Sequence, residues 1–171
     1  MSEEETTLHL LVGKICAGKS TLAAALGRAP RTVVVSEDAW LSALFGDEMQ
    51  TVADYVRCAA KLRAAMEPHL IALLRVGLSV VLDFPANTPA TRGWMRGLFE
   101  TAGCAHRLHF LDVTDDICKL RLQQRNAEGT HAFTVSEEEF DRISSHFVAP
   151  SDDEGFEILV YPGTRSLPKA D

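Results

Sequence analysis

The sequence has no long hydrophobic run and no pair of closely spaced cysteines. No segment reaches the roughly 18 to 20 consecutive apolar residues that a membrane-spanning helix requires. Residues 1–5 are acidic, whereas the start of a secretion signal is basic. The four cysteines, Cys16, Cys58, Cys104 and Cys118, are too far apart for a zinc ribbon or a disulfide scaffold. These absences predict a cytoplasmic protein with no membrane partner and with reduced thiols.

Basic residues are also scarce. The chain has 17 Lys and Arg against 24 Asp and Glu, which gives a net charge of −7. A negative protein is not broadly attracted to nucleic acid or to an anionic membrane, so we expect a small-molecule partner and consider nucleic acid less favoured. The six histidines form no H-x-x-x-H or H-E-x-x-H grouping, which disfavours a histidine-bound metal cluster.

The 171 residues are 46% hydrophobic, which suits one globular domain over residues 1–171, with a loose tail from about residue 162. Helical stretches alternate with short apolar runs rich in β-branched residues. This alternation predicts an α/β fold with a parallel sheet that helices cover on both faces. The five runs are residues 8–12, 32–35, 78–84, 108–113 and 156–161.

Capping signals predict where several helices begin and end. Thr88 followed by Pro89 starts a helix that ends at Gly103. Ser136-Glu137-Glu138-Glu139 reads as a capping box that opens a helix carrying Phe140 and Ile143. Residues 51–76 also look helical, and we expect Pro68 to kink or split that helix near Glu67.

Residues 13–20 read G-x-x-x-x-G-K-S and lie between the first apolar run and a helical stretch. Glycines at these positions let backbone N–H groups wrap phosphate oxygens at a helix N-terminus. Lys19 is then placed to reach the β and γ phosphates of ATP, and Ser20 to bind Mg²⁺. The predicted nucleotide-binding residues are Gly13, Lys14, Ile15, Cys16, Ala17, Gly18, Lys19, Ser20 and Thr21.

Acidic residues lie at or just after the ends of three of the predicted strands, at the edge of the sheet where ligands of such folds bind. After the second strand, Asp38 could accept or orient the proton of an attacking hydroxyl, although Asp38 or Ser36 could instead cap a helix. At the third strand, Asp83 is typical of a Walker B carboxylate that holds Mg²⁺, with a turn-forming role as the alternative. Asp112, at the fourth strand, competes for that metal role.

Arg121 and Arg125 are four residues apart on the helix predicted after the fourth strand, so they share a face. If that face points to the nucleotide, the two guanidinium groups neutralise charge on the transferred phosphoryl group. The alternative is a solvated or salt-bridged face. Residues 126–130 could form a short lid that excludes water.

Together these motifs resemble the small P-loop kinases, a group that includes zeta toxins, chloramphenicol phosphotransferase and the kinase domain of bacteriophage polynucleotide kinase. The likeness spans nearly the whole chain. It is carried by GKICAGKST at 13–21, SEDAWL at 36–41 with LFG at 44–46, VVLDFPANTPATR at 80–92, LRLQQRN at 120–126 and PSDDEGF at 150–156. The resemblance implies a three-layer α/β/α fold with a five-stranded parallel sheet in the order 2-3-1-4-5.

The resemblance also implies residue roles. Asp38 matches the catalytic base, Arg121 and Arg125 match lid arginines, and Asn87 and Arg92 match a loop that lines the acceptor side. Asp83 matches the acid of the third strand. Glu37 keeps the choice of base open, because a shift of one residue would exchange it with Asp38; we place Glu37 in the acceptor-binding set.

We therefore expect an ATP- and Mg²⁺-dependent kinase that phosphorylates a hydroxyl of a small molecule. A polynucleotide 5′-hydroxyl kinase or a zeta-like nucleotide-sugar kinase is the alternative enzyme. Leu41 and Ser42 stand where many relatives carry a basic residue, which weakens the polynucleotide alternative. A nucleotide-dependent ATPase switch is the alternative from another class. The sequence names neither the acceptor nor the oligomeric state.

Overall fold

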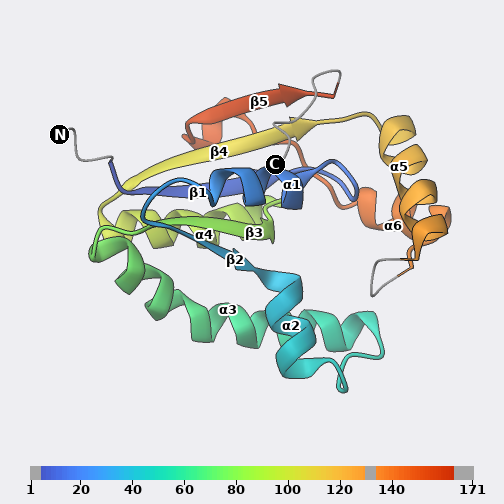
Figure 1. Ribbon diagram of the computed structural model, residues 1–171, viewed down its shortest axis with the longest axis horizontal. Helices are drawn as coiled ribbons and strands as arrows, with labels where there is room; N and C mark the ends of the chain where they lie inside the picture. Colours follow the sequence, from blue (N-terminus) through green and yellow to red (C-terminus); the bar gives the residue numbers. More distant parts are fainter. Residues whose placement is uncertain (1–4, 130–133, 164–171) are drawn as a thin grey trace.

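The computed structural model describes residues 5–129 and 134–163, which form a parallel sheet with helices on both faces (Figure 1). All pairings are parallel, and the strand order is β2-β3-β1-β4-β5, as the family resemblance implied. The strands are β1 Thr7–Val12, β2 Thr32–Ser36, β3 Ser79–Pro85, β4 Ala105–Asp112 and β5 Ile158–Pro162. The helices are α1 Lys19–Leu26, α2 Glu37–Phe45, α3 Val52–Arg75, α4 Pro89–Ala102, α5 Asp115–Glu128 and α6 Glu137–Ser144, with a 3₁₀ turn at Asp152–Glu154.

The side chains of β1 alternate between two hydrophobic cores. Leu8 and Leu10 are fully buried with residues of α3 and α4, whereas Leu11 is fully buried with residues of α1, α5 and α6. Because successive strand residues point to opposite faces, both sides of the sheet must be covered by helices. This confirms the predicted three-layer α/β/α arrangement.

The predicted helix starts are confirmed by hydrogen bonds. The Thr88 hydroxyl accepts the Thr91 N–H at 3.2 Å, and Gly103 ends α4 with φ of 70°. Ser136 and Glu139 form the predicted capping box of α6. On this helix the side chain of Phe140 is fully buried, whereas that of Ile143 is 48% exposed.

Pro68 does not split its helix, so one of the two expected outcomes, a split, was wrong and the other, a kink, stays a prediction. Helix α3 continues unbroken through Pro68 from Val52 to Arg75. Every fourth residue of one face, Leu62, Met66, Leu70 and Leu74, is buried against the core. Burying each of these side chains stabilises the helix by about 1.5–3 kcal/mol, which together exceeds the roughly 3 kcal/mol that an internal proline costs.

The predicted C-terminal tail and the predicted lid at residues 126–130 both begin later in the chain than expected. Pro162 is still in β5, opposite Asp112, and the Gly163 N–H donates to the Asp112 carbonyl at 3.0 Å. Residues 126–128 of the expected lid belong to α5, and the Asn126 side chain donates to the Val135 carbonyl at 2.8 Å. The rest of the expected tail from 164, and Thr130 of the lid, lie outside the described residues.

The sheet holds a histidine pair that the sequence did not reveal. His9 Nδ1 of β1 and His109 Nε2 of β4 are 3.0 Å apart and share a hydrogen bond. His109 Nδ1 lies 2.9 Å from the Tyr161 hydroxyl of β5. Burial lowers the pKa of both histidines to about 4, so both rings are neutral near pH 7. The four cysteines are free, and no helix in the described residues is long and apolar enough to cross a bilayer.

Candidate active site

The loop between β1 and α1 has the backbone shape that a phosphate needs. Cys16 has φ of 60° and Gly18 has φ of 106°, so two left-handed residues curl the chain before α1 begins. Such turns direct successive backbone N–H groups inward, toward an anion at the helix N-terminus. A side chain at Gly13 would be crowded, since its Cβ would lie 3.0 Å from that of Ala17.

Lys19 folds back over this loop. Its ammonium group donates to the carbonyls of Gly13 at 2.5 Å and Lys14 at 2.8 Å. Burial lowers the pKa of Lys19 to about 8, while the nearby charges of Asp83 and Asp38 oppose that shift. Lys19 is therefore mainly cationic at neutral pH, and it must release these two carbonyls to reach a phosphate.

Asp83 lies beside Ser20 at the same end of the sheet. Burial raises the pKa of Asp83, while a hydrogen bond with Ser20 and the charge of Lys19 oppose that rise. A hydroxyl and a carboxylate are the hard oxygen ligands that Mg²⁺ prefers, so the two residues fit the ion. Among residues 5–129 and 134–163, no three acidic, histidine or cysteine side chains surround a metal site, so phosphate oxygens would supply the remaining ligands.

The competing acid, Asp112, has a different setting. It is exposed at the end of β4, and its backbone carbonyl accepts the Gly163 N–H. The acids that perturb Lys19 are Asp83 and Asp38. The geometry therefore favours Asp83 as the metal-binding carboxylate.

Glu37 and Asp38 are adjacent in the sequence but differ completely in their surroundings. Asp38 is exposed in the first turn of α2. The helix is capped by Ser36, whose hydroxyl accepts the Ala39 N–H at 3.4 Å, so the carboxylate of Asp38 is not needed as the cap.

Glu37 is fully buried and its carboxylate is occupied. It accepts two hydrogen bonds from Arg63, at 3.1 and 3.0 Å, and one from the Tyr55 hydroxyl at 3.1 Å. Burial raises the pKa of Glu37, and Arg63 opposes the rise. Glu37 thus holds α2 against α3, and its expected contact with an acceptor is not supported.

Arg92 also differs from expectation. It is fully buried and donates to both carboxylate oxygens of Glu154, at 2.6 and 2.8 Å. It also donates to the carbonyls of Ala86 at 2.9 Å and Val148 at 3.0 Å. Its donors are engaged inside the protein, so the structure does not support acceptor binding by Arg92.

Asn87 contacts the phosphate-binding loop through its side chain. Its side-chain oxygen accepts the Gly13 N–H at 2.9 Å, and its side-chain nitrogen donates to the Gly13 carbonyl at 2.8 Å. No local sequence pattern indicates this contact, because the two residues are 74 positions apart.

Of the two arginines of α5, Arg121 contacts the phosphate-binding loop. Arg121 Nη1 lies 3.2 Å from the Cys16 carbonyl and 3.3 Å from the Ala17 carbonyl, and donates to both. Arg125 Nε is buried and has no hydrogen-bond partner among the described residues. A buried donor of this kind is costly unless a ligand or water completes it.

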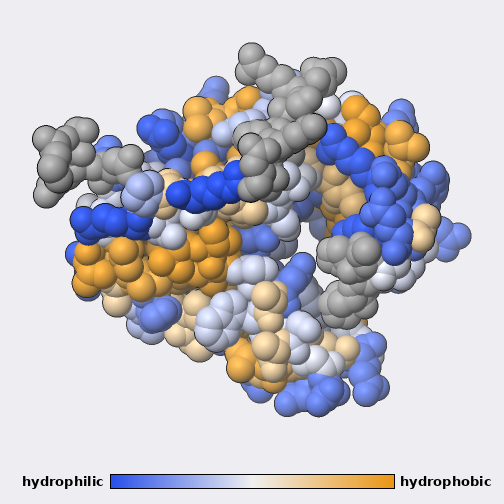
Figure 2. All heavy atoms as spheres, viewed as in Figure 1, coloured by the Kyte–Doolittle hydropathy of each residue, from blue (hydrophilic) through white to orange (hydrophobic). Residues whose placement is uncertain are grey.

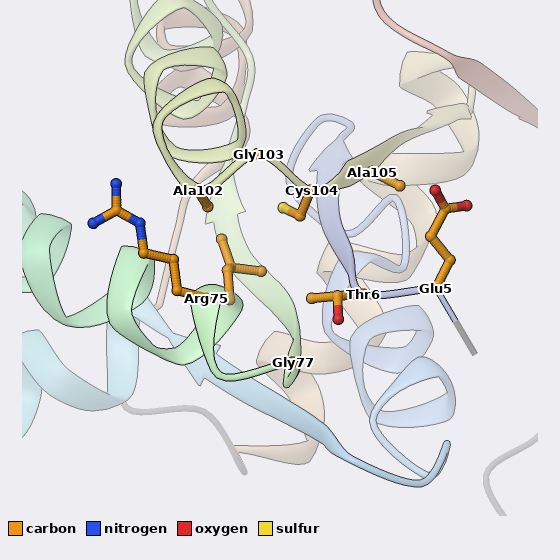
Figure 3. Close-up of a pocket in the computed structure, with 9 residues that line it drawn as sticks. Glu5, Thr6, Arg75, Gly77, Ala102, Gly103, Cys104 and Ala105 are labelled. Carbon is orange, nitrogen blue, oxygen red and sulfur yellow. The ribbon is translucent and has the colours of Figure 1, made fainter. Parts of the chain in front are cut away.

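The surface is hollowed between the part formed by α2 and the part formed by α5 and α6, where Figure 2 shows an opening. A separate cavity of about 310 Å³ lies at the opposite end of the sheet, between the ends of α3 and α4 and the starts of β1 and β4. In Figure 3, Cys104 points toward this cavity, while the Arg75 guanidinium points away from it. This second cavity is remote from the phosphate-binding loop.

The parallel sheet of order 2-3-1-4-5, with its glycine-rich loop between β1 and α1, defines a P-loop NTPase fold. The chain belongs to the AAA domain family AAA_33, a P-loop kinase family whose model matches residues 8–150. Among curated protein sequences, none matches this chain.

Solved structures of kinases share the fold. A kinase-like protein from Chloroflexus aurantiacus is 20% identical, with a TM-score of 0.74 over 94% of this chain and 87% of its own. The Mycobacterium tuberculosis APS kinase CysC, solved with AMPPNP and APS, is 20% identical, with a TM-score of 0.65 over 95% and 91%. A sugar kinase from Janibacter sp. is 16% identical, with a TM-score of 0.65 over 94% and 87%.

Proposed function

We propose that this protein is a kinase that transfers the γ-phosphate of ATP to a hydroxyl group of a small molecule in the cytoplasm. The observation that carries the proposal is the convergence of Lys19, Asp38 and Asp83. The charges of both acids reach the lysine, which lies over the phosphate-binding loop. A cation for phosphate, a carboxylate for metal and an exposed carboxylate for the acceptor are the groups that phosphoryl transfer requires.

Each group has a separate task in this proposal. Ser20 and Asp83 hold Mg²⁺, which would neutralise phosphate charge when bound. Lys19 leaves the Gly13 and Lys14 carbonyls and binds the β and γ phosphates. The exposed Asp38 carboxylate accepts the proton of the acceptor hydroxyl as the oxygen attacks phosphorus.

Arg121 and Arg125 stabilise the phosphoryl group during transfer. Arg121 already contacts the loop through two carbonyls, at distances of 3.2 and 3.3 Å, that are long for a charge-assisted hydrogen bond. Arg125 has a buried donor that an anion would satisfy. The negative charge on the transferred phosphoryl group is therefore stabilised by the two arginines of α5, whereas Asp38 belongs to α2.

A polynucleotide acceptor is the second candidate. It is supported by the likeness to a chain of the Pnkp1/Rnl/Hen1 RNA repair complex, which is 21% identical, with a TM-score of 0.60 over 85% of this chain and 45% of that one. The net charge of −7 and the absence of a basic residue at Leu41 and Ser42 favour a small acceptor instead.

The test is transfer of label from γ-labelled ATP, with Mg²⁺, to a panel of hydroxyl compounds. The panel contains nucleosides, sugars, nucleotide sugars, aminoglycosides, chloramphenicol and a 5′-hydroxyl oligonucleotide. Label on one small compound, lost in Asp38→Asn, supports the proposal and identifies the acceptor class. Label on the oligonucleotide alone would favour the second candidate, and nucleotide-dependent binding of a protein with slow ATP hydrolysis would favour a switch.

A further inference from the structure

Asn87 continues the pairing between two strands by means of its side chain. Beyond the end of β3, the Ala86 N–H still donates to the Leu11 carbonyl of β1 at 3.0 Å. One residue further, the carboxamide of Asn87 both accepts from the Gly13 N–H and donates to the Gly13 carbonyl. A carboxamide carries the same donor and acceptor as a peptide unit, so it acts here as a substitute strand partner.

Asn87 is itself held rigidly. Its backbone carbonyl accepts the Val148 N–H at 2.9 Å. Arg92 donates to the carbonyl of Ala86, the residue before Asn87, and to the carbonyl of Val148. Arg92 is in turn fixed by its buried ion pair with Glu154. The side chain of Asn87 therefore projects from a supported backbone, and such support is needed to hold a functional group in place.

The Gly13 carbonyl accepts two donors, Asn87 Nδ2 at 2.8 Å and Lys19 Nζ at 2.5 Å. Gly13 is buried, so this carbonyl has little access to water. In the proposed function, Lys19 leaves it for the phosphates. Asn87 then remains as its donor, and it is the side chain that keeps the buried carbonyl satisfied in the nucleotide-bound state.

We propose that Asn87 is a positioning residue of the nucleotide site: it anchors the first residue of the phosphate-binding loop when Lys19 moves to the nucleotide. This inference rests on the proposed function for the movement of Lys19. Loss of Asn87 should therefore affect the nucleotide-bound protein more than the free protein. Without Asn87, the free protein still satisfies the Gly13 carbonyl through Lys19, whereas the nucleotide-bound protein does not.

The test compares Asn87→Ala with Thr88→Ala, a matched control from the next position. Thr88 caps α4 through its bond to the Thr91 N–H and makes no contact with the loop in the interactions described above. Calorimetry would give the dissociation constant for ATP with Mg²⁺, and thermal unfolding would give Tm. We expect Asn87→Ala to weaken binding about tenfold, and Thr88→Ala to lower Tm while leaving affinity within about twofold of wild type. Equal affinity losses in the two variants would overturn the proposal.

A second measurement needs no nucleotide and so separates this inference from the proposed function. Lys19→Ala imitates departure of the lysine, and amide hydrogen exchange reports on the loop at residues 13–20. We expect Asn87→Ala to speed exchange modestly alone and by more than tenfold further when combined with Lys19→Ala. Additive effects would contradict the shared role at Gly13. Failure of the wild type to bind ATP would contradict the proposed function while this double-variant result still decides the role of Asn87.

Discussion

Two groups of charged residues lie at the carboxyl end of the sheet and differ in how their bonding is completed. In the first, which we call the clamp, the buried carboxylate of Glu37 binds Arg63 and Tyr55. In the second, which we call the reaction group, Lys19, Asp38 and Asp83 influence one another's charge. The clamp satisfies its carboxylate within the protein, whereas Asp38 remains exposed and Lys19 rests on carbonyls it can leave.

The comparison teaches that burial, rather than residue type, distinguishes these two groups of charged residues. Glu37 and Asp38 are adjacent acids in the first turn of one helix. A carboxylate that is buried and fully hydrogen-bonded is expensive to disturb and therefore fixes geometry. An exposed carboxylate next to a phosphate site is free to exchange a proton with a substrate.

The largest expected effect comes from neutralising the two neighbouring acids, Glu37 and Asp38, in separate variants. Asp38→Asn should lower turnover by roughly 10²–10⁴-fold with little change in Tm, because it removes a proton acceptor from an exposed position. Glu37→Gln should instead lower the free energy of unfolding by about 1.5–3 kcal/mol, because it weakens charged hydrogen bonds to Arg63 and Tyr55. Steady-state kinetics and urea denaturation measure the two effects. A turnover loss in Glu37→Gln as large as that in Asp38→Asn would break the comparison.

A second buried ion pair should behave like the clamp. Glu154→Gln leaves the fully buried guanidinium of Arg92 without its counter-charge, so we expect a loss of about 3–5 kcal/mol in the free energy of unfolding. Glu100→Gln is the matched control, because Glu100 is exposed and lies 3.8 Å from Arg96. That control should change stability by less than about 1 kcal/mol. Similar losses in both variants, measured by denaturant unfolding, would remove the distinction between buried and exposed pairs.

Acid should destabilise the sheet through the histidine pair. The ordinary pKa of histidine is 6.5, and in the folded protein those of His9 and His109 are about 4. As pH falls from 6.5 toward 4, the unfolded chain takes up protons that the folded chain does not, so stability is lost over that window. The double variant His9→Gln, His109→Gln should show a shallower fall in Tm between these pH values than the wild type, with exposed His69→Gln as the control. Parallel Tm profiles for the wild type and the double variant would contradict this.

The smallest effect concerns the shape of the loop itself. Cys16 has φ of 60°, a conformation that costs a side chain about 1 kcal/mol and costs glycine little. Cys16→Gly should therefore be about 1 kcal/mol more stable than Cys16→Ala, although both lose the thiol. In ordinary helix or strand positions the order is reversed. Thermal unfolding of the two variants decides, and an alanine variant at least as stable as the glycine variant would show that the loop is relaxed at this residue.

Features set by neighbouring residues were predictable from the sequence. The phosphate-binding loop is a spacing of glycines, lysine and serine within eight positions, and the caps at Thr88 and Ser136 act within three residues. The strands follow from apolar runs of four to seven residues in the chain. The sheet order came from the resemblance that these motifs carry, and the structure confirms it.

Features that depend on distant partners were decided by the tertiary structure. The sequence left Glu37 and Asp38 as alternatives, and Arg63 and Tyr55, 26 and 18 positions away, separate them. The hydrogen bonds of Asn87 to Gly13 likewise join residues 74 positions apart. A local pattern specifies what the backbone can do over a few residues, but a side chain's role depends on which groups satisfy it. In a parallel sheet those groups come from strands and helices far apart in the sequence, so packing alone decides which acid is buried and which stays exposed.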